Sequence, residues 1–374
     1  MKLRSFKPNN RLLMGPGPSN VHPRVLKALG RPTIGHLDPQ FIELMDEIKS
    51  LLKYAFQTEN EVTFAISGPG SVGMESCLVN LIEPDEKVIV CINGVFGGRM
   101  KDIVERCGAT PIEVTAPWGS AIDPADLEDK LSQNEDASLV AFVHAETSTG
   151  AKSDIKTLTE IAHKYNCLTI ADTVTSLGGI PLLIDEWKID CAYSGTQKCL
   201  SCPPGLSPVT FNNKAVDLIK NRKSKVQSWF MDLNLVLGYW GSSTKRSYHH
   251  TAPINSLYGL HEALLILKEE GLEQSWERHK KNGQKLVEEL GGIGLLPYVK
   301  AEERLPELTS IAVPAEVDEA EVRKILLEEY NIEIGAGLGD LAGKIWRIGL
   351  MGHTSTEENI NTFVSAINNI LEND

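Results

Sequence analysis

DIKTLTEIAHKYNCLTIAD, residues 154–172, contains the pattern that decides the fold. Residues 154–166 place apolar side chains at the spacing of an amphipathic helix, and residues 167–172 are a short apolar run typical of a buried strand. The same two signals alternate along most of the chain. Strand and helix in alternation predict an α/β fold, with a large domain whose mainly parallel sheet is flanked by helices.

The rest of the chain predicts further elements of both kinds. After about residue 270 the alternation changes to an α+β pattern, which is typical of a second, smaller domain. We therefore predict an extended segment at 1–20, a large domain at 21–270 and a small C-terminal domain at 271–374. The predicted helices are 41–56, 100–108, 256–271, 275–290 and 356–372, and the predicted strands are 87–94, 138–146, 207–211, 308–315 and 344–350.

The composition argues against several classes of protein. Hydrophobic residues make up 42% of the chain, yet no apolar run approaches the roughly 18 residues that cross a bilayer. The net charge of −13 argues against nucleic acid or an anionic membrane as a partner. The seven cysteines have scattered spacings that do not suggest a disulfide framework. Because residues 1–19 lack the apolar stretch of a secretory signal, we expect a cytoplasmic protein.

A glycine-rich loop, SGPGS at 67–71, opens a predicted helix. The backbone N–H groups of Gly70 and Ser71 at such a helix start can hold a phosphate, whereas Pro69 has no N–H to donate. The loop lacks the Gly-Lys-Ser/Thr of a nucleotide P-loop, so a phosphorylated cofactor fits it better than ATP. The alternative is a plain tight turn.

Two charged residues follow predicted strands. Asp172 ends an apolar run, where a carboxylate is costly unless it pairs with a positive group; the alternative is a helix cap. Lys198 follows a second strand end, directly before Cys199 and Cys202, and its alternative is an ordinary solvated lysine. Because parallel strands end at one edge of a sheet, we expect both charges to face one pocket.

These features together fit pyridoxal 5'-phosphate, which needs a lysine amine, an acid at the pyridine nitrogen, a phosphate cradle and a flat side chain over the ring. Lys198, Asp172 and the loop 67–71 are the candidates for the first three. Phe96 follows the predicted strand 87–94 and is the candidate for stacking; its alternative is a core aromatic. Arg347 lies in an apolar run and can bind a substrate carboxylate, unless it forms a structural ion pair.

A set of motifs in fixed order carries a resemblance to a known family. They are LLMGPGPSNVHPRV, IGHLD, SGPGS, NGVFGGR, HAETSTG, ADTVTSLGG, YSGTQKCLSCPPG, YHHTAPINSLYGL and RIGLMGH. From about residue 12 to its end, the chain resembles the alanine–glyoxylate and serine–pyruvate aminotransferases. These are class V, fold-type I enzymes that use pyridoxal phosphate.

The resemblance implies a role for each candidate around the cofactor. Lys198 matches the lysine that forms the Schiff base and later moves the substrate proton. Asp172 matches the acid at the pyridine nitrogen, and Thr147 matches the hydroxyl near the cofactor's ring oxygen. Gln197 matches a residue that contacts the phosphate.

The resemblance also implies substrates and assembly. Arg347 matches the residue that binds the substrate carboxylate. Tyr248 and Thr251 match phosphate contacts supplied by the partner subunit, so a homodimer is the expected active unit. The expected reaction is ping-pong transfer of an amino group from alanine or serine to glyoxylate or pyruvate; another donor, such as ureidoglycine, is the alternative.

Two positions depart from the better-known animal members of the family. Phe96 stands where a tryptophan usually covers the ring, which keeps a stacking face. In the phosphate cradle, Pro69 and Ser71 replace a serine and a histidine. Gly70 and Ser71 are therefore expected to carry more of the phosphate binding.

Two rivals share the fold. Cysteine desulfurases stack a histidine on the ring and place one before the lysine, whereas this chain has Phe96 and Gln197. They also need a reactive cysteine late in the chain, and the last one here is Cys202. A non-catalytic relative, kept as a binding or accessory subunit, has no reason to keep Lys198, Asp172 and Arg347 together.

No metal site is expected. Cys199 and Cys202 lack a second pair at the spacing of zinc ligands. His249 and His250 are expected to point to opposite faces of a strand, and so not to bind one ion together.

Overall fold

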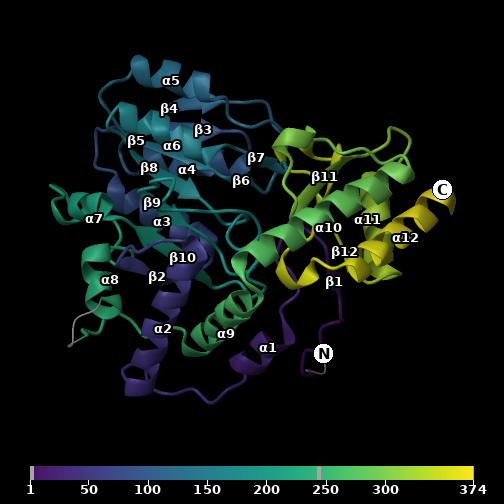
Figure 1. Ribbon diagram of the computed structural model, residues 1–374, viewed down its shortest axis with the longest axis horizontal. Helices are drawn as coiled ribbons and strands as arrows, with labels where there is room; N and C mark the ends of the chain where they lie inside the picture. The colour runs from purple at the N-terminus through teal and green to yellow at the C-terminus, as the bar shows by residue number, and fades with distance from the viewer. Residues whose placement is uncertain (1–3, 242–245, 374) are drawn as a thin grey trace.

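The computed structural model describes residues 4–241 and 246–373, and its centre is a seven-stranded sheet (Figure 1). The strand order is β2-β10-β9-β8-β5-β3-β4. Neighbours from β9 to β4 run parallel, as predicted, whereas β10 is antiparallel to both of its neighbours. The strands are β2 (Val62–Ser67), β3 (Lys87–Ile92), β4 (Thr110–Thr115), β5 (Ala137–Val143), β8 (Leu168–Asp172), β9 (Cys191–Tyr193) and β10 (Leu206–Phe211).

Helices cover both faces of this sheet, which confirms the predicted α/β fold (Figure 1). α3 contacts α4, and α5 contacts α6. This pairing is expected, because right-handed crossovers place α3 and α4 on one face of the sheet and α5 and α6 on the other. Three further helices form a group in which α9 contacts both α1 and α2, and this group reaches the sheet where α2 contacts β2 and α9 contacts β10. The helices are α1 (Pro23–Leu29), α2 (Pro39–Phe56), α3 (Gly70–Leu81), α4 (Val95–Arg106), α5 (Pro124–Ser132), α6 (Ile155–Lys164), α7 (Asn213–Lys220), α8 (Leu233–Trp240) and α9 (Ile254–Glu270).

A second hydrophobic core lies in the C-terminal part of the chain. It contains side chains of α10, α11 and α12 and of the antiparallel sheet β11-β14-β13. The buried Met14 belongs to it, and β1 (Leu12–Leu13) pairs with β12 (Ile332–Glu333), so the N-terminal segment packs with the C-terminal part. The domain boundaries at 20 and 270 stay predictions. The remaining elements are α10 (Leu272–Gly292), β11 (Leu308–Ala312), α11 (Glu319–Glu328), β13 (Gly335–Ala336), β14 (Ile345–Gly349) and α12 (Glu357–Asn373).

The carboxyl ends of the parallel strands meet at one edge of the large sheet, next to the second core (Figure 1). The predicted strand 138–146 breaks there, because β6 (Ala145–Glu146) leaves the sheet and pairs with β7 (Ala151–Lys152). Among the described residues, no helix is long and apolar enough to span a membrane.

Candidate active site

The loop 67–71 forms a cradle of backbone N–H groups at the start of α3. The N-cap is Pro69, which makes no side-chain capping bond, and the N–H of Val72 already donates to Pro69 O at 2.7 Å. Gly70 and Ser71 follow the cap, where the first N–H groups of a helix have no intrahelical acceptor. A Cβ on Gly70 would stand 3.1 Å from Val174 Cγ2, so glycine keeps the cradle open. These N–H groups suit an anion at the positive end of the helix.

Asp172 ends β8 with only 2% of its surface exposed. Its Oδ1 accepts from the N–H of Val174 at 2.9 Å, and its Oδ2 accepts from the hydroxyl of Tyr193 at 2.7 Å. Burial raises the pKa of Asp172 to about 7. The bond to Val174 resembles a helix cap, but in the described part of the chain no helix starts there. No basic side chain of the described residues forms an ion pair with Asp172, so the carboxylate can still pair with a positive ligand.

Lys198 lies in the loop between β9 and β10 and is buried, with 7% exposed. Its ammonium donates to the carbonyl of Pro16, and no acidic side chain of the described residues lies within ion-pair distance. Burial, together with the charge of Arg347, lowers the pKa of Lys198 to about 8. A solvated lysine is therefore excluded, and about a tenth of the amine is neutral at pH 7, far more than for an ordinary lysine.

The N-terminal segment closes over this lysine, which the sequence did not indicate. Ser19 donates from its hydroxyl to the carbonyl of Lys198 at 2.7 Å. A Cβ on Gly17 would stand 2.5 Å from Lys198 Nζ, and Gly17 has φ +107°, a conformation that favours glycine.

Arg347 enters the site from the middle of β14. Its Nε donates to the carbonyl of Ala336 at 2.7 Å, and its Nη1 donates to the carbonyl of Thr147 at 2.9 Å. No acidic side chain in the described ranges pairs with it, so the ion pair considered from the sequence is not formed there. Burial lowers the pKa of Arg347 to about 10. Two backbone carbonyls fix the guanidinium, and Nη2 remains for an anionic ligand.

Glu146, which the sequence did not indicate as a site residue, directly precedes Thr147 and contacts the backbone of Phe96. The hydroxyls of Thr147 and Thr175 form a hydrogen bond. Glu146 is fully buried; it accepts from the N–H of Phe96 at 3.3 Å and from the hydroxyl of Ser148 at 2.6 Å. Burial raises the pKa of Glu146. Its carboxylate lies at the start of α4 and fixes the backbone that carries Phe96.

The ring of Phe96 is half-buried at the second residue of α4. The guanidinium of Arg99 lies over one face of this ring, 4.8 Å from its centroid. The sequence did not indicate this contact.

Gln197 provides a direct test of whether these residues fit a cofactor. Its Oε1 is buried and has no hydrogen-bond partner among the described residues. A Cβ on Gly195 would stand 2.8 Å from this atom, so the amide lies close to the loop that precedes it. A buried amide without a partner is costly unless a ligand satisfies it. Oε1 accepts only, so it is the NH₂ of the same amide that can donate to a phosphate oxygen, and with the open cradle, Asp172 and Lys198 this side chain fits pyridoxal phosphate.

Tyr248 and Thr251 do not join this group of residues. The side chain of Tyr248 is 62% exposed and its ring lies 5.2 Å from that of His36, and Thr251 is also exposed. The segment still lies near the cradle, because His250 Nε2 is 2.8 Å from the hydroxyl of Ser67.

The expectation that His249 and His250 lie in a strand was wrong. They lie outside any strand, and their Nδ1 atoms are 2.8 Å apart. Alternation of side chains therefore does not separate them. No third His, Cys, Asp or Glu of the described residues joins them to form a metal-binding group.

Comparisons with known proteins place the chain in a family. The family model for class-V aminotransferases matches residues 14–363. The chain belongs to the class-V aminotransferase family. As a class-V aminotransferase, it is 41% identical to an alanine–glyoxylate aminotransferase of Felis catus over 99% of this chain and 90% of the cat protein.

Two solved structures show the same fold-type I architecture. A Nostoc alanine–glyoxylate aminotransferase has a TM-score of 0.97 and 46% identity, and covers 99% of this aminotransferase and 98% of its own chain. A Bacillus subtilis ureidoglycine–glyoxylate aminotransferase has a TM-score of 0.96 and 37% identity, and covers 99% and 95%. The names of these two proteins give different amino donors, alanine and ureidoglycine, and the same acceptor, glyoxylate.

Proposed function

We propose that this aminotransferase uses pyridoxal phosphate to move an amino group from alanine or serine to glyoxylate or pyruvate. The observation that carries the proposal is a pair of buried cations, Lys198 and Arg347, without an acidic partner among the described residues. They interact electrostatically, because the charge of Arg347 helps to lower the pKa of Lys198. A site with an available amine beside a fixed guanidinium suits substrates that carry a carboxylate next to the reacting carbon.

Each residue around these cations has a defined task. The N–H groups of Gly70 and Ser71 and the amide of Gln197 would hold the phosphate, and Asp172 would pair with the pyridine nitrogen. When bound, the cofactor supplies a carbonyl carbon that takes up the amino group and a ring that accepts electrons.

Lys198 would take the proton from the substrate Cα and deliver it to the carbon on the other side of the transferred nitrogen. Its neutral form is accessible because its pKa is about 8. Arg347 would hold the carboxylate of each substrate in turn through Nη2, since Nε and Nη1 are bound to the carbonyls of Ala336 and Thr147. The donor and the acceptor would thus bind in the same orientation, as a ping-pong reaction requires.

The active unit that we propose is a homodimer. Tyr248 and Thr251 are exposed and make no hydrogen bond to the cradle of their own subunit among the described contacts. They are free to reach the phosphate of a partner subunit. A cytoplasmic location stays a prediction.

A second candidate donor is ureidoglycine, because a ureidoglycine–glyoxylate transaminase is among the similar proteins. A donor screen separates the candidates. Purified protein with glyoxylate would be supplied in turn with L-alanine, L-serine and (S)-ureidoglycine, and glycine formation would be followed. We expect alanine or serine to give the highest kcat/KM; a higher value for ureidoglycine would favour the second candidate, and no glycine from any donor would reject both.

A further inference from the structure

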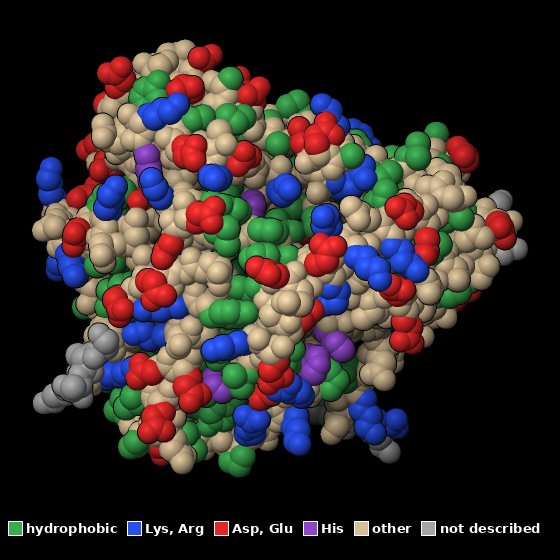
Figure 2. Space-filling view, in the orientation of Figure 1, with side chains coloured by type: hydrophobic (Ala, Val, Ile, Leu, Met, Phe, Trp, Pro, Cys, Tyr) green, Lys and Arg blue, Asp and Glu red, His purple; other side chains and the backbone are tan. Residues whose placement is uncertain are grey.

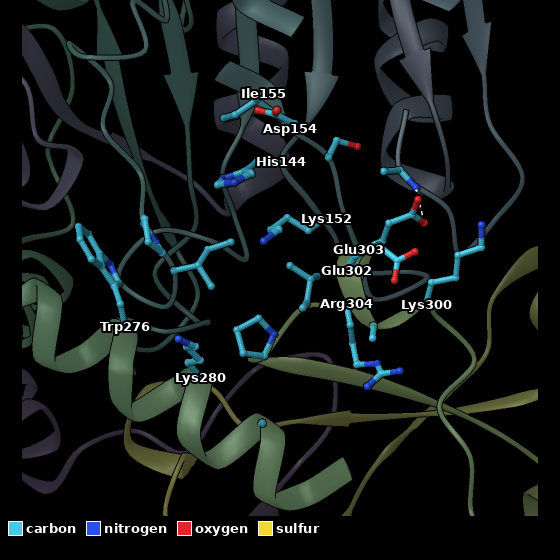
Figure 3. A pocket seen from close by; sticks show the side chains of 18 of the residues that line it. His144, Lys152, Asp154, Ile155, Trp276, Lys280, Lys300, Glu302, Glu303 and Arg304 are labelled. Atoms are coloured by element: carbon cyan, nitrogen blue, oxygen red, sulfur yellow. Dashed lines mark hydrogen bonds between the residues drawn. The ribbon is translucent and has the colours of Figure 1, made fainter. Parts of the chain in front are cut away.

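A cleft of about 1370 Å³ opens beside α10, and none of the active-site residues described above lines it. Its walls are α10, the loop after β4, the segment 152–156 and the turn 300–306 (Figure 3). Neither Lys198 nor Arg347 lines it. On the face drawn in Figure 2, hydrophobic side chains lie between the sheet and α10, with Lys and Arg side chains beside them. We call this space the α10 cleft.

Apolar and aromatic side chains form much of its wall. Trp187 packs edge-on against His144, with ring centroids 5.8 Å apart. Ile180 and Pro306 line the same space, and Trp276 projects into it from α10 (Figure 3). Such a wall favours the apolar body of a ligand over a nucleotide or a sugar.

The cleft also contains polar groups whose hydrogen-bonding capacity is unused. His144 is 4% exposed, and its Nδ1 has no hydrogen-bond partner in the described part of the chain. Trp276 Nε1, which can only donate, is also buried without a partner there. Burial lowers the pKa of His144 to about 3, so this imidazole is neutral. Buried polar atoms without partners are uncommon in native proteins and call for a ligand or water.

Lys152 provides the charge. It lies on β7 beside His144, on the side of the cleft that faces Trp276 and Lys280 (Figure 3). Its ammonium has no acidic side chain within ion-pair distance among the described residues. It is half-buried, so a charged partner here would be less screened than at the surface.

The acidic groups of the cleft limit the charge of the ligand. Asp123 and Asp154 cap α5 and α6, because they accept from the N–H groups of Ala125 and Thr157. Glu303 accepts from the N–H of Ala121 at 3.1 Å. Glu302 at the exposed rim and three glutamates of α10 also line the cleft (Glu273, Glu277 and Glu288), and Lys152 interacts electrostatically with the buried Glu307. These carboxylates would repel a dianion.

We propose that the α10 cleft binds a monocarboxylic acid with an apolar body, whose carboxylate pairs with Lys152 and whose body packs on Trp187 and Trp276. Trp276 Nε1–H is the second donor to the ligand. Because β7 pairs with β6, which follows β5 of the large sheet, and α10 contributes to the second core, the ligand would bridge the two parts of the chain.

Calorimetric titration of the purified holoenzyme with phenylacetate, and with the neutral analogue phenylacetamide, tests the proposal. We expect saturable binding of phenylacetate only. Lys152→Gln is expected to weaken it roughly tenfold or more, as the loss of a charge-assisted contact does. Trp276→Phe, which removes only the N–H, is expected to weaken it less. Lys220→Gln, on α7, is the matched control with unchanged affinity.

Arg347→Ala separates this cleft from the active site, because phenylacetate could also bind that guanidinium. Retained binding by Arg347→Ala, together with loss in Lys152→Gln, supports the proposal. No saturable binding, equal binding of the amide, unaltered affinity in Lys152→Gln, or loss of binding in Arg347→Ala would each overturn it. Circular dichroism and unchanged transaminase turnover of Lys152→Gln show that this variant is folded.

Discussion

The hydroxyl of Tyr193 donates to Oδ2 of Asp172 at 2.7 Å, and both side chains are buried. This bond favours the ionised carboxyl and opposes burial, which raises the pKa of Asp172 to about 7. The two residues come from neighbouring strands, because Asp172 in β8 is the pairing partner of Tyr193 in β9. Tyr193 is thus a positioning residue for the acid that would pair with the pyridine nitrogen.

Tyr193→Phe is expected to weaken cofactor binding about tenfold, because one hydrogen bond to a charged group is lost. The pKa of Asp172 would rise further, so that less carboxylate is present at neutral pH. Titration of the apoprotein with pyridoxal phosphate measures the Kd. Tyr165→Phe is the matched control, and equal Kd values for the two variants would contradict a role for Tyr193.

Glu146→Gln is expected to destabilise the start of α4. One carboxylate oxygen becomes an NH₂ group, which cannot accept from the N–H of Phe96 or from Ser148. The expected cost is about 1–3 kcal/mol. Thermal unfolding and amide hydrogen exchange in the first turn of α4 measure it, and Glu160→Gln on the exposed face of α6 is the control. Unchanged exchange near Phe96 would reject this role.

Arg347→Lys is expected to raise KM for the amino acid by roughly tenfold or more while leaving the Kd for the cofactor unchanged. An ammonium cannot make the bonds to Ala336 and Thr147 and also offer the planar fork that a carboxylate prefers. Steady-state kinetics and cofactor titration separate the two effects. If both constants stayed at their wild-type values, Arg347 would not be the carboxylate binder.

The rate at which the apoprotein captures pyridoxal phosphate is expected to rise with pH and to level off above about pH 8. The sign follows from the chemistry: the attacking amine must be neutral, and burial lowers the pKa of Lys198 from 10.5 to about 8. Arg347→Gln removes a cationic neighbour and should move the midpoint upward. Stopped-flow absorbance across this range measures it, and a rate that kept rising to pH 10 would contradict a lowered pKa.

The sequence was sufficient to predict the position of a site residue where that position depends only on the strand that carries it. Asp172 stands at the end of a short apolar run, and the parallel order of β5 and β8 follows from the helix between them. The direction of β10 was not predictable in this way, because the long connection from β9 has no helix to fix it.

Contacts between distant segments could not be predicted. The carbonyl of Pro16 meets Lys198 because the N-terminal segment packs beside the second core, and no local pattern encodes that. Glu146 lies within the HAETSTG motif, but its contact with Phe96 depends on how β5 and β3 lie side by side. The one sequence signal for a role of Glu146 was an acidic residue within that motif, directly after an apolar strand.

The half-reaction with L-alanine tests the central claim, amino transfer through Lys198, most directly. The purified protein, mixed with L-alanine and no oxo acid, is expected to lose its visible absorption band and release pyruvate in proportion to enzyme. Glyoxylate is then expected to restore the band and give glycine, whereas Lys198→Ala should do neither while remaining folded. A colourless wild-type protein, an unchanged band or full activity of Lys198→Ala would contradict the account.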